Sequence, residues 1–122
     1  MAASSLTVMS ACGVIEELTS TDDSFEFWEA PYAVTVTHVS CRCRGTGCST
    51  TLATFTLEDR GGNAMVITGT NPTCATTGDS TYAAVTSAND LAAGEGIAFD
   101  VTNSPTASNA YTICVKYTVD RQ

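Results

Sequence analysis

The stretch FEFWEAPYAVTVTHVSCRC, residues 25–43, decides the fold that we expect for this chain. It holds the only Trp and the only His of the sequence, together with two of the six Cys. Its first part, FEFWE, is typical of a short aromatic strand, and Pro31 predicts a corner directly after it. The second part alternates valine with threonine, which predicts a long β-strand from Ala33 to Cys43.

The side chains of that long strand change parity near His38. Val34 and Val36 fall on one face of a regular strand. Val39 and Cys41 fall on the other face. Because successive side chains of a strand alternate between its two faces, one face cannot hold both sets. We therefore predict a β-bulge or bend near His38, or burial of both faces.

The rest of the chain is patterned as further short strands between turn residues. The last strand is the clearest, because apolar and polar side chains alternate from Tyr111 to Val119. DRGGN at 59–63 predicts a hairpin turn, and the glycines of the loop at 89–96 predict positive φ angles. The other predicted strands span residues 51–58, 64–67, 73–77, 82–86 and 97–101.

This series of strands, with no segment patterned as a long helix, predicts an all-β domain. We expect an antiparallel, jelly-roll-like β-sandwich of seven to eight strands. Immunoglobulin-like connectivity is the alternative, because strand order cannot be read from strand spacing. A length of 122 residues suits one domain. We assign residues 25–122 to the sandwich.

Residues 1–24, rich in Ser, Thr and Ala, are expected to form an N-terminal arm. Its small apolar cluster, Val14, Ile15 and Leu18, suits one helical turn or a strand that pairs with a neighbour. Chain termini are mobile unless other contacts hold them. The arm therefore either docks on another subunit or frays.

Charge and hydropathy exclude several classes of partner. The chain has 13 Asp and Glu against 5 Lys and Arg, a formal net charge of -8, and this field repels a phosphate backbone. We expect no nucleic-acid partner. No stretch approaches the ~20 apolar residues that span a bilayer, so we expect no membrane partner, and the start lacks the pattern of a signal peptide. Synthesis in the cytosol and release in a particle would reconcile six cysteines with that missing signal.

The cysteines are the strongest candidates for chemistry. Cys41, Cys43 and Cys48 form C-x-C-x4-C behind His38, which superficially matches a zinc site. A zinc knuckle uses C-x2-C on a tight turn, however, and no second half follows, so we favour a mixture of small buried hydrophobic cysteines and one or two disulfides. Cys43 with Cys48, or Cys48 with Cys74, are the pairings that we consider, and the sequence cannot choose among the many that six cysteines allow.

No catalytic constellation is present, so we expect neither an enzyme nor a cofactor. His38 is the only histidine, and a lone His within a strand is more typical of a surface or an interface than of a catalyst. The carboxylate pairs Asp22-Asp23 and Glu58-Asp59 lie at loop edges, where solvation is favoured over calcium. The aromatic residues near Trp28 suit a core or subunit contact better than a sugar platform.

Four segments resemble the small β-sandwich proteins of tailed-bacteriophage virions: FWEAPYAVTVTHVSC, ATFTLEDRGGNAM, LAAGEGIAFDVT and YTICVKYTV. The nearest type is the jelly-roll capsid decoration, or cement, protein, and the resemblance covers residues 25–119. It implies a non-enzymatic virion protein that forms homotrimers on the outer capsid surface and locks subunits of the major capsid protein together. The cysteine content departs from that pattern.

The resemblance also implies which residues make contacts in the virion. We expect the apolar cluster of the arm and the aromatic stretch to form the subunit or capsid interface, with these residues: Val14, Ile15, Leu18, Phe25, Phe27, Trp28 and Tyr32. The alternative function is a glycan-binding sandwich module, at a phage tail tip or on a secreted protein.

Overall fold

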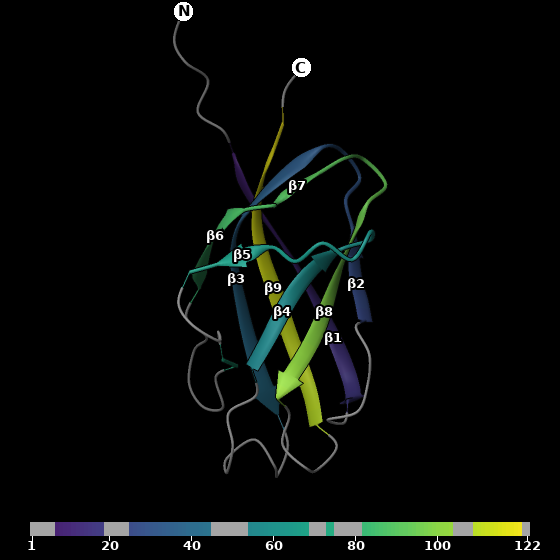
Figure 1. The fold of residues 1–122 in the computed structure, drawn as a ribbon, viewed down its shortest axis with the longest axis vertical. Helices are drawn as coiled ribbons and strands as arrows, with labels where there is room; N and C mark the ends of the chain where they lie inside the picture. Colours follow the sequence, from purple (N-terminus) through teal and green to yellow (C-terminus); the bar gives the residue numbers. More distant parts are fainter. Residues whose placement is uncertain are drawn as a thin grey trace, which may run out of the picture.

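The computed structural model describes residues 7–18, 25–44, 54–68, 73–74, 82–103 and 109–120. These residues form two antiparallel β-sheets and contain no helix. The larger sheet has the order β1-β9-β3-β6-β5, with β7 beside β3, and the smaller sheet has the order β2-β8-β4. In Figure 1, β4 and β8 cross in front of the long strands of the larger sheet. The predicted all-β sandwich is confirmed, whereas jelly-roll connectivity stays a prediction.

The described residues contain nine strands, slightly more than expected. The larger sheet is built from β1 (Val8–Leu18), β9 (Asn109–Val119), β3 (Val34–Arg44), β6 (Ala83–Ser87), β5 (Val66–Ile67) and β7 (Asp90–Leu91). The smaller sheet is built from β2 (Phe25–Glu29), β8 (Gly96–Asn103) and β4 (Thr54–Asp59).

The core lies between the two sheets, and aromatic rings join them. On β9 the predicted alternation is confirmed, because Tyr111, Ile113, Val115 and Tyr117 are all buried. Tyr111 lies 5.6 Å from the ring of Phe99 on β8, measured between ring centroids. Offset aromatic pairs at such distances stabilise beyond the area they bury. The inner face of β9 is therefore the surface on which the smaller sheet packs.

Strand β3 contains the predicted bulge. Its pairing with β9 shifts register between Val36 and His38. Val36 on one side of the shift is fully buried, and Val39 on the other is 1% exposed. The bulge adds one residue to β3, so the valines on both sides of it point to the same face of the sheet, toward the core.

The corner at Pro31 is held in place by backbone hydrogen bonds of the preceding residue, Ala30. Ala30 is completely buried; its N–H donates to the Glu95 carbonyl at 2.8 Å, and its carbonyl accepts from the Gly94 N–H at 2.8 Å. Gly94 has a φ of 87°, as the loop glycines predicted. The loop before β8 therefore fixes the corner between β2 and β3.

Part of the segment expected to be an arm lies within the sandwich. Residues 8–18 form β1, the edge strand of the larger sheet, which pairs antiparallel with β9 from Val8 opposite Thr118 to Leu18 opposite Asn109. Of the two possibilities for the apolar cluster, the strand is correct. Residues 1–6 and 19–24 lie outside the described residues, so docking of an arm stays a prediction.

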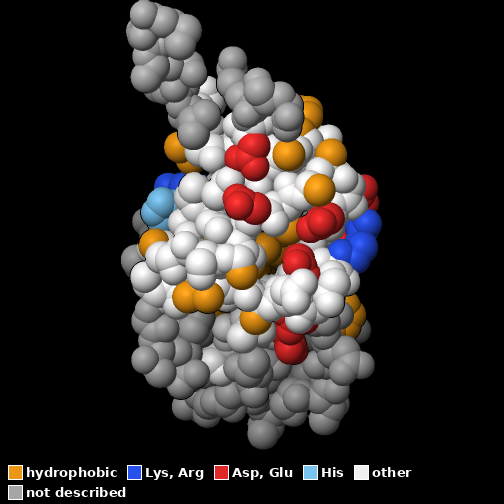
Figure 2. Space-filling model, turned by 45° about the horizontal axis from the view of Figure 1, so that its top comes forward, with side chains coloured by type: hydrophobic (Ala, Val, Ile, Leu, Met, Phe, Trp, Pro, Cys, Tyr) orange, Lys and Arg blue, Asp and Glu red, His pale blue; other side chains and the backbone are white. Residues whose placement is uncertain are grey.

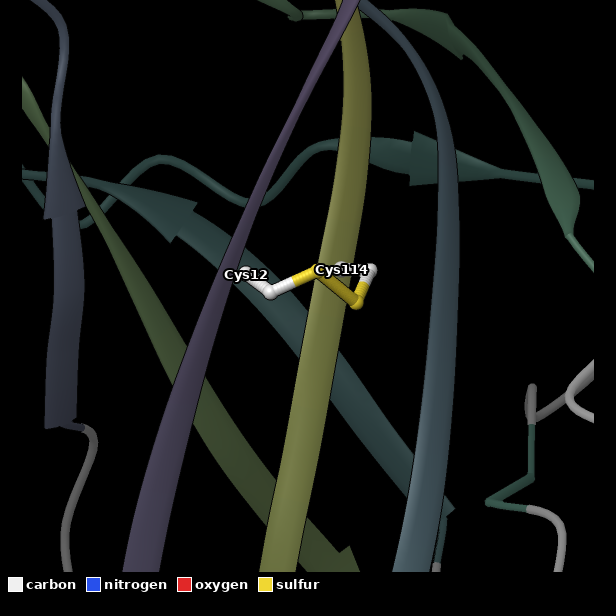
Figure 3. The surroundings of a disulfide bond; sticks show 2 residues. All are labelled: Cys12 and Cys114. Atoms are coloured by element: carbon white, nitrogen blue, oxygen red, sulfur yellow. A yellow bond between two sulfur atoms is a disulfide. The ribbon is translucent and has the colours of Figure 1, made fainter.

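A disulfide joins β1 to the strand beside it. Cys12 and Cys114 face each other in the register of β1 and β9, with 4.1 Å between their Cα atoms (Figure 3). They are 102 residues apart in the chain. In the chain-entropy account, closing so long a loop in the unfolded state stabilises the fold by about 4.7 kcal/mol.

A second disulfide joins Cys41 on β3 to Cys74. The considered pairing of Cys48 with Cys74 is therefore wrong, because the Cys74 sulfur is already bonded. Cys43 is disulfide-bonded too, and Cys48 lies outside the described residues. Choosing between such pairings requires the position of Cys74 relative to β3, which local sequence does not carry.

Gly13 on β1 marks a close approach between the sheets. A Cβ atom placed there would lie 2.8 Å from the Cβ of Phe27 on β2, closer than such atoms approach in proteins. We expect Gly13→Ala to lower the free energy of unfolding by about 1–3 kcal/mol through overpacking. Urea unfolding of the variant, beside Ser10→Ala at an exposed position of β1, measures the effect. Equal stability of the two variants would contradict this account.

The two mapped disulfides differ in their access to solvent. Cys12 is exposed, whereas Cys41 and Cys74 are 3% and 0% exposed. Because thiol–disulfide exchange requires access to a sulfur, mild reductant acting on the folded protein should open Cys12–Cys114 first. Alkylation of the freed thiols followed by peptide mass mapping checks the order. Labelling of Cys41 or Cys74 before Cys12 would overturn this prediction.

Candidate interaction surface

The apolar cluster of β1 is divided between the two faces of the strand. Val14 is 63% exposed on the outer face, whereas Ile15 is 8% exposed and belongs to the core. The side chain of Leu18 lies outside what the structure describes. Of this predicted cluster, Val14 is therefore open for contact in the free chain, and Ile15 instead anchors β1 to the sandwich.

The aromatic residues of the opening stretch are also divided. Phe25 is 41% exposed and Tyr32 is 51% exposed, whereas Phe27 and Trp28 are half-buried against the core. The pairing of β2 with β8 shifts register between Glu26 and Trp28, so the strand is irregular where the rings change face. Both faces of β2 are covered at Phe27 and Trp28 but open at Phe25. A role for these rings in a subunit contact stays a prediction.

The Trp28 ring packs between the sheets and is poorly placed to act as a binding platform. Its ring centroid lies 4.7 Å from that of Tyr117 on β9, so it contributes to the contact between sheets. A sugar platform requires a planar ring face open to solvent. Tyr32, at the corner after β2, is the more open ring of this stretch.

Arg60 ties the β4–β5 turn to two other segments. Its Nη2 lies 2.9 Å from Glu26 Oε1, and its Nη1 donates to the Gly94 carbonyl at 2.7 Å. Glu29 lies farther away, at 3.4 Å. The hydrogen bond to Glu26 raises the pKa of Arg60 above its ordinary value. Because the groups are exposed, this cluster orients the turn more than it stabilises the fold.

The turn itself depends on Asp59, and the predicted turn is confirmed, although β5 pairs with β6 in the larger sheet and not with β4 as a hairpin would require. The Asp59 carboxylate accepts the Asn63 N–H at 2.9 Å, and Gly62 has a φ of 86°. The next residue, Ala64, bridges back to Glu58 in antiparallel pairing. The hydrogen bonds from the Asn63 backbone and side chain lower the pKa of Asp59 below its ordinary value.

Sequence reasoning overlooked the basic side chains of the larger sheet. Arg42 and Arg44 lie on the outer face of β3, and Lys116 lies on the outer face of β9 with its Nζ 4.2 Å from the ring centre of Tyr82. Figure 2 shows acidic side chains across the visible face, with basic ones only at its margins. The available signal was the alternation in SCRCR, where buried Cys imply outward Arg.

The parts of the chain that the structure describes contain no cluster of three His, Cys, Asp or Glu able to hold a metal ion. Cys41 and Cys43 are both in disulfides, so neither offers a thiolate to zinc. His38 is half-buried, with its Nδ1 3.0 Å from Thr37 Oγ1. Asp22-Asp23 lies outside the described residues. Within the described ranges there is also no helix long and apolar enough to span a membrane.

The fold resembles chains of two solved phage capsids. A chain of the cyanophage Pam1 capsid asymmetric unit is similar with a TM-score of 0.65 and 18% identity, over 98% of this chain and 93% of that chain. A chain of the acidic stable capsid of Helicobacter pylori bacteriophage KHP30 is similar with a TM-score of 0.48 and 14% identity, over 92% and 87%. No protein-family model and no curated protein matches this chain. The Pam1 likeness shows a shared fold along nearly the whole chain.

The Asp59 turn predicts a specific response to acid. A carboxyl group whose pKa is lowered in the folded state stabilises the fold above its unfolded pKa, and this contribution disappears as the pH falls through the folded value. The stability advantage of the native protein over Asp59→Asn should therefore be complete near neutral pH and decline as the pH falls below the ordinary pKa of an aspartate. Urea unfolding of both proteins across this range measures it. Parallel pH curves would contradict the role of the carboxylate.

Proposed function

We propose that this protein is a non-enzymatic structural component of a phage virion. The single observation that carries the proposal is its fold likeness to a chain of the Pam1 capsid asymmetric unit, which extends over 98% of this chain. The resemblance of residues 25–119 to decoration proteins supports the same role from the sequence.

The architecture suits a part that must persist in a particle. Both termini of the sandwich are held, because the start of β1 pairs with the end of β9 and a disulfide joins the same two strands. A second disulfide joins β3 to Cys74. Covalent links of this kind restrict the unfolded chain and so favour the folded state.

In the finer form of the proposal, the protein decorates the outer surface of the capsid as a homotrimer and binds the major capsid protein. The exposed apolar side chains are its available contacts, and Val14, Phe25 and Tyr32 are those that the sequence named. A protein that binds only the closed shell shifts the equilibrium toward that shell by mass action. Stabilisation of this kind requires no catalysis.

Particles assembled without this protein test the proposal. They should lose integrity at a lower temperature than complete particles, and adding back the purified protein should restore the original temperature. Genome release on heating, followed by a DNA-binding dye, provides the measurement. The proposed trimer is tested separately by sedimentation of the purified protein.

Two results would count against this function. Absence of the protein from purified virions, judged by mass spectrometry, would exclude a structural role there. Unchanged heat resistance of particles that lack it would exclude the cementing role while leaving a virion location intact.

A further inference from the structure

A pocket of about 340 Å³ opens on the outer face of the larger sheet. It is lined by Ser40, Arg42, Arg44, Thr112 and Cys114. The register of β3 and β9 explains this set, because Ser40 lies opposite Cys114 and Arg42 lies opposite Thr112. All five side chains therefore rise from the same face of two neighbouring strands, away from the core.

One polar atom of this pocket lacks a partner. Within the described residues, the Arg42 Nε is a buried side-chain nitrogen without a hydrogen bond. A buried donor of this kind costs free energy unless an acceptor reaches it, and folded proteins leave few unsatisfied. Because the Nε atom itself is covered while Arg42 lines an open pocket, an acceptor that enters the pocket reaches this donor when the Arg42 side chain turns outward.

The charges around the pocket indicate what that acceptor is. Of the five Lys and Arg in the chain, three lie on this face: Arg42, Arg44 and Lys116. The ion pairs among the described residues are both made by Arg60, so the charges of Arg42 and Arg44 are not neutralised by a described carboxylate. The guanidinium fork matches a carboxylate geometrically and binds it through charge-assisted hydrogen bonds.

We propose that this pocket binds a carboxylate side chain, Asp or Glu, of a neighbouring protein chain. The volume is roughly ten times the ~30 Å³ that one water occupies in the liquid, so the pocket accepts a carboxylate together with the segment that carries it. Val14, exposed and directly opposite Thr112 across β1 and β9, adds an apolar contact beside the pocket. A sheet face with a charged recess and an exposed apolar side chain beside it suits a protein partner.

The net charge of the molecule also favours a protein over a free anion. At -8, the protein as a whole repels small anions, and the cations of the described residues that are not paired with a carboxylate lie on this sheet face. A carboxylate on a protein surface has further contacts to hold it there, whereas a free anion has none. This inference rests on the sheet face alone and stands independently of the virion role.

The test follows the Arg42 Nε–H signal by NMR of the ¹⁵N-labelled full chain. The probe is an end-blocked glycine pentapeptide with a central glutamate, and the matched control has glutamine instead. The glutamate peptide should shift the Arg42 signal and saturate in the millimolar range, with no shift from the control. Arg44→Gln should weaken this binding about tenfold or more, the size expected for a lost charge-assisted hydrogen bond.

Arg60→Gln is the matched variant, because it removes an exposed arginine that lies outside the pocket, and it should change the affinity less than about twofold. Equal binding of the glutamine peptide, no binding of either peptide, or equal loss in both variants would overturn the proposal. Inorganic phosphate that binds as tightly as the peptide would overturn the protein partner in favour of a free anion. A shift that grows with protein concentration alone would support it, with a second copy as the neighbour.

Discussion

The pairing of β9 with a long strand on each side is the constraint on which the rest of this structure depends. β9 hydrogen-bonds to β1 along one edge and to β3 along the other, for almost its whole length. Its inner face then receives the smaller sheet through Tyr111 and Tyr117, which meet Phe99 and Trp28. Because β9 lies between β1 and β3 in the larger sheet, these two strands cannot be joined until residues 109–119 are in place.

The distribution of cations distinguishes two kinds of arginine on this acidic protein. Arg60 is used internally, since Glu26, Glu29 and the Gly94 carbonyl all face its guanidinium group. Arg42 lines an open pocket, and its Nε–H has no hydrogen-bond acceptor. The first arginine shapes a turn, and the second is placed to meet something beyond the chain.

Much of the sandwich follows from local sequence. The alternation in Tyr111–Val119 predicts β9, the parity change near His38 predicts the bulge in β3, and DRGGN predicts the turn after β4, because each depends on residues close in the chain. The pairing of β1 with β9 joins residues about a hundred positions apart, so no local pattern carries it. The pairing partner of Cys74 was misjudged for the same reason.

The candidate contact residues were predicted less completely, also for physical reasons. Val14 and Ile15 were both predicted as contact residues because both are hydrophobic. Side chains alternate along β1, however, so Val14 points outward and Ile15 points into the core. Predicting the basic pocket requires the knowledge that β9 lies beside β3, because Thr112 and Cys114 on β9 line it together with Arg42 on β3. A side chain's exposure on a strand is a local property, whereas a pocket is a property of neighbouring strands.

The covalent link between the first and last long strands limits how copies of this protein can associate. An edge strand near a chain terminus is the element that proteins most easily exchange with an identical neighbour. Here the Cys12–Cys114 bond fastens that strand to its own chain. Exchange of β1 between copies would require the bond to open, so under oxidising conditions any association between copies would use their surfaces alone.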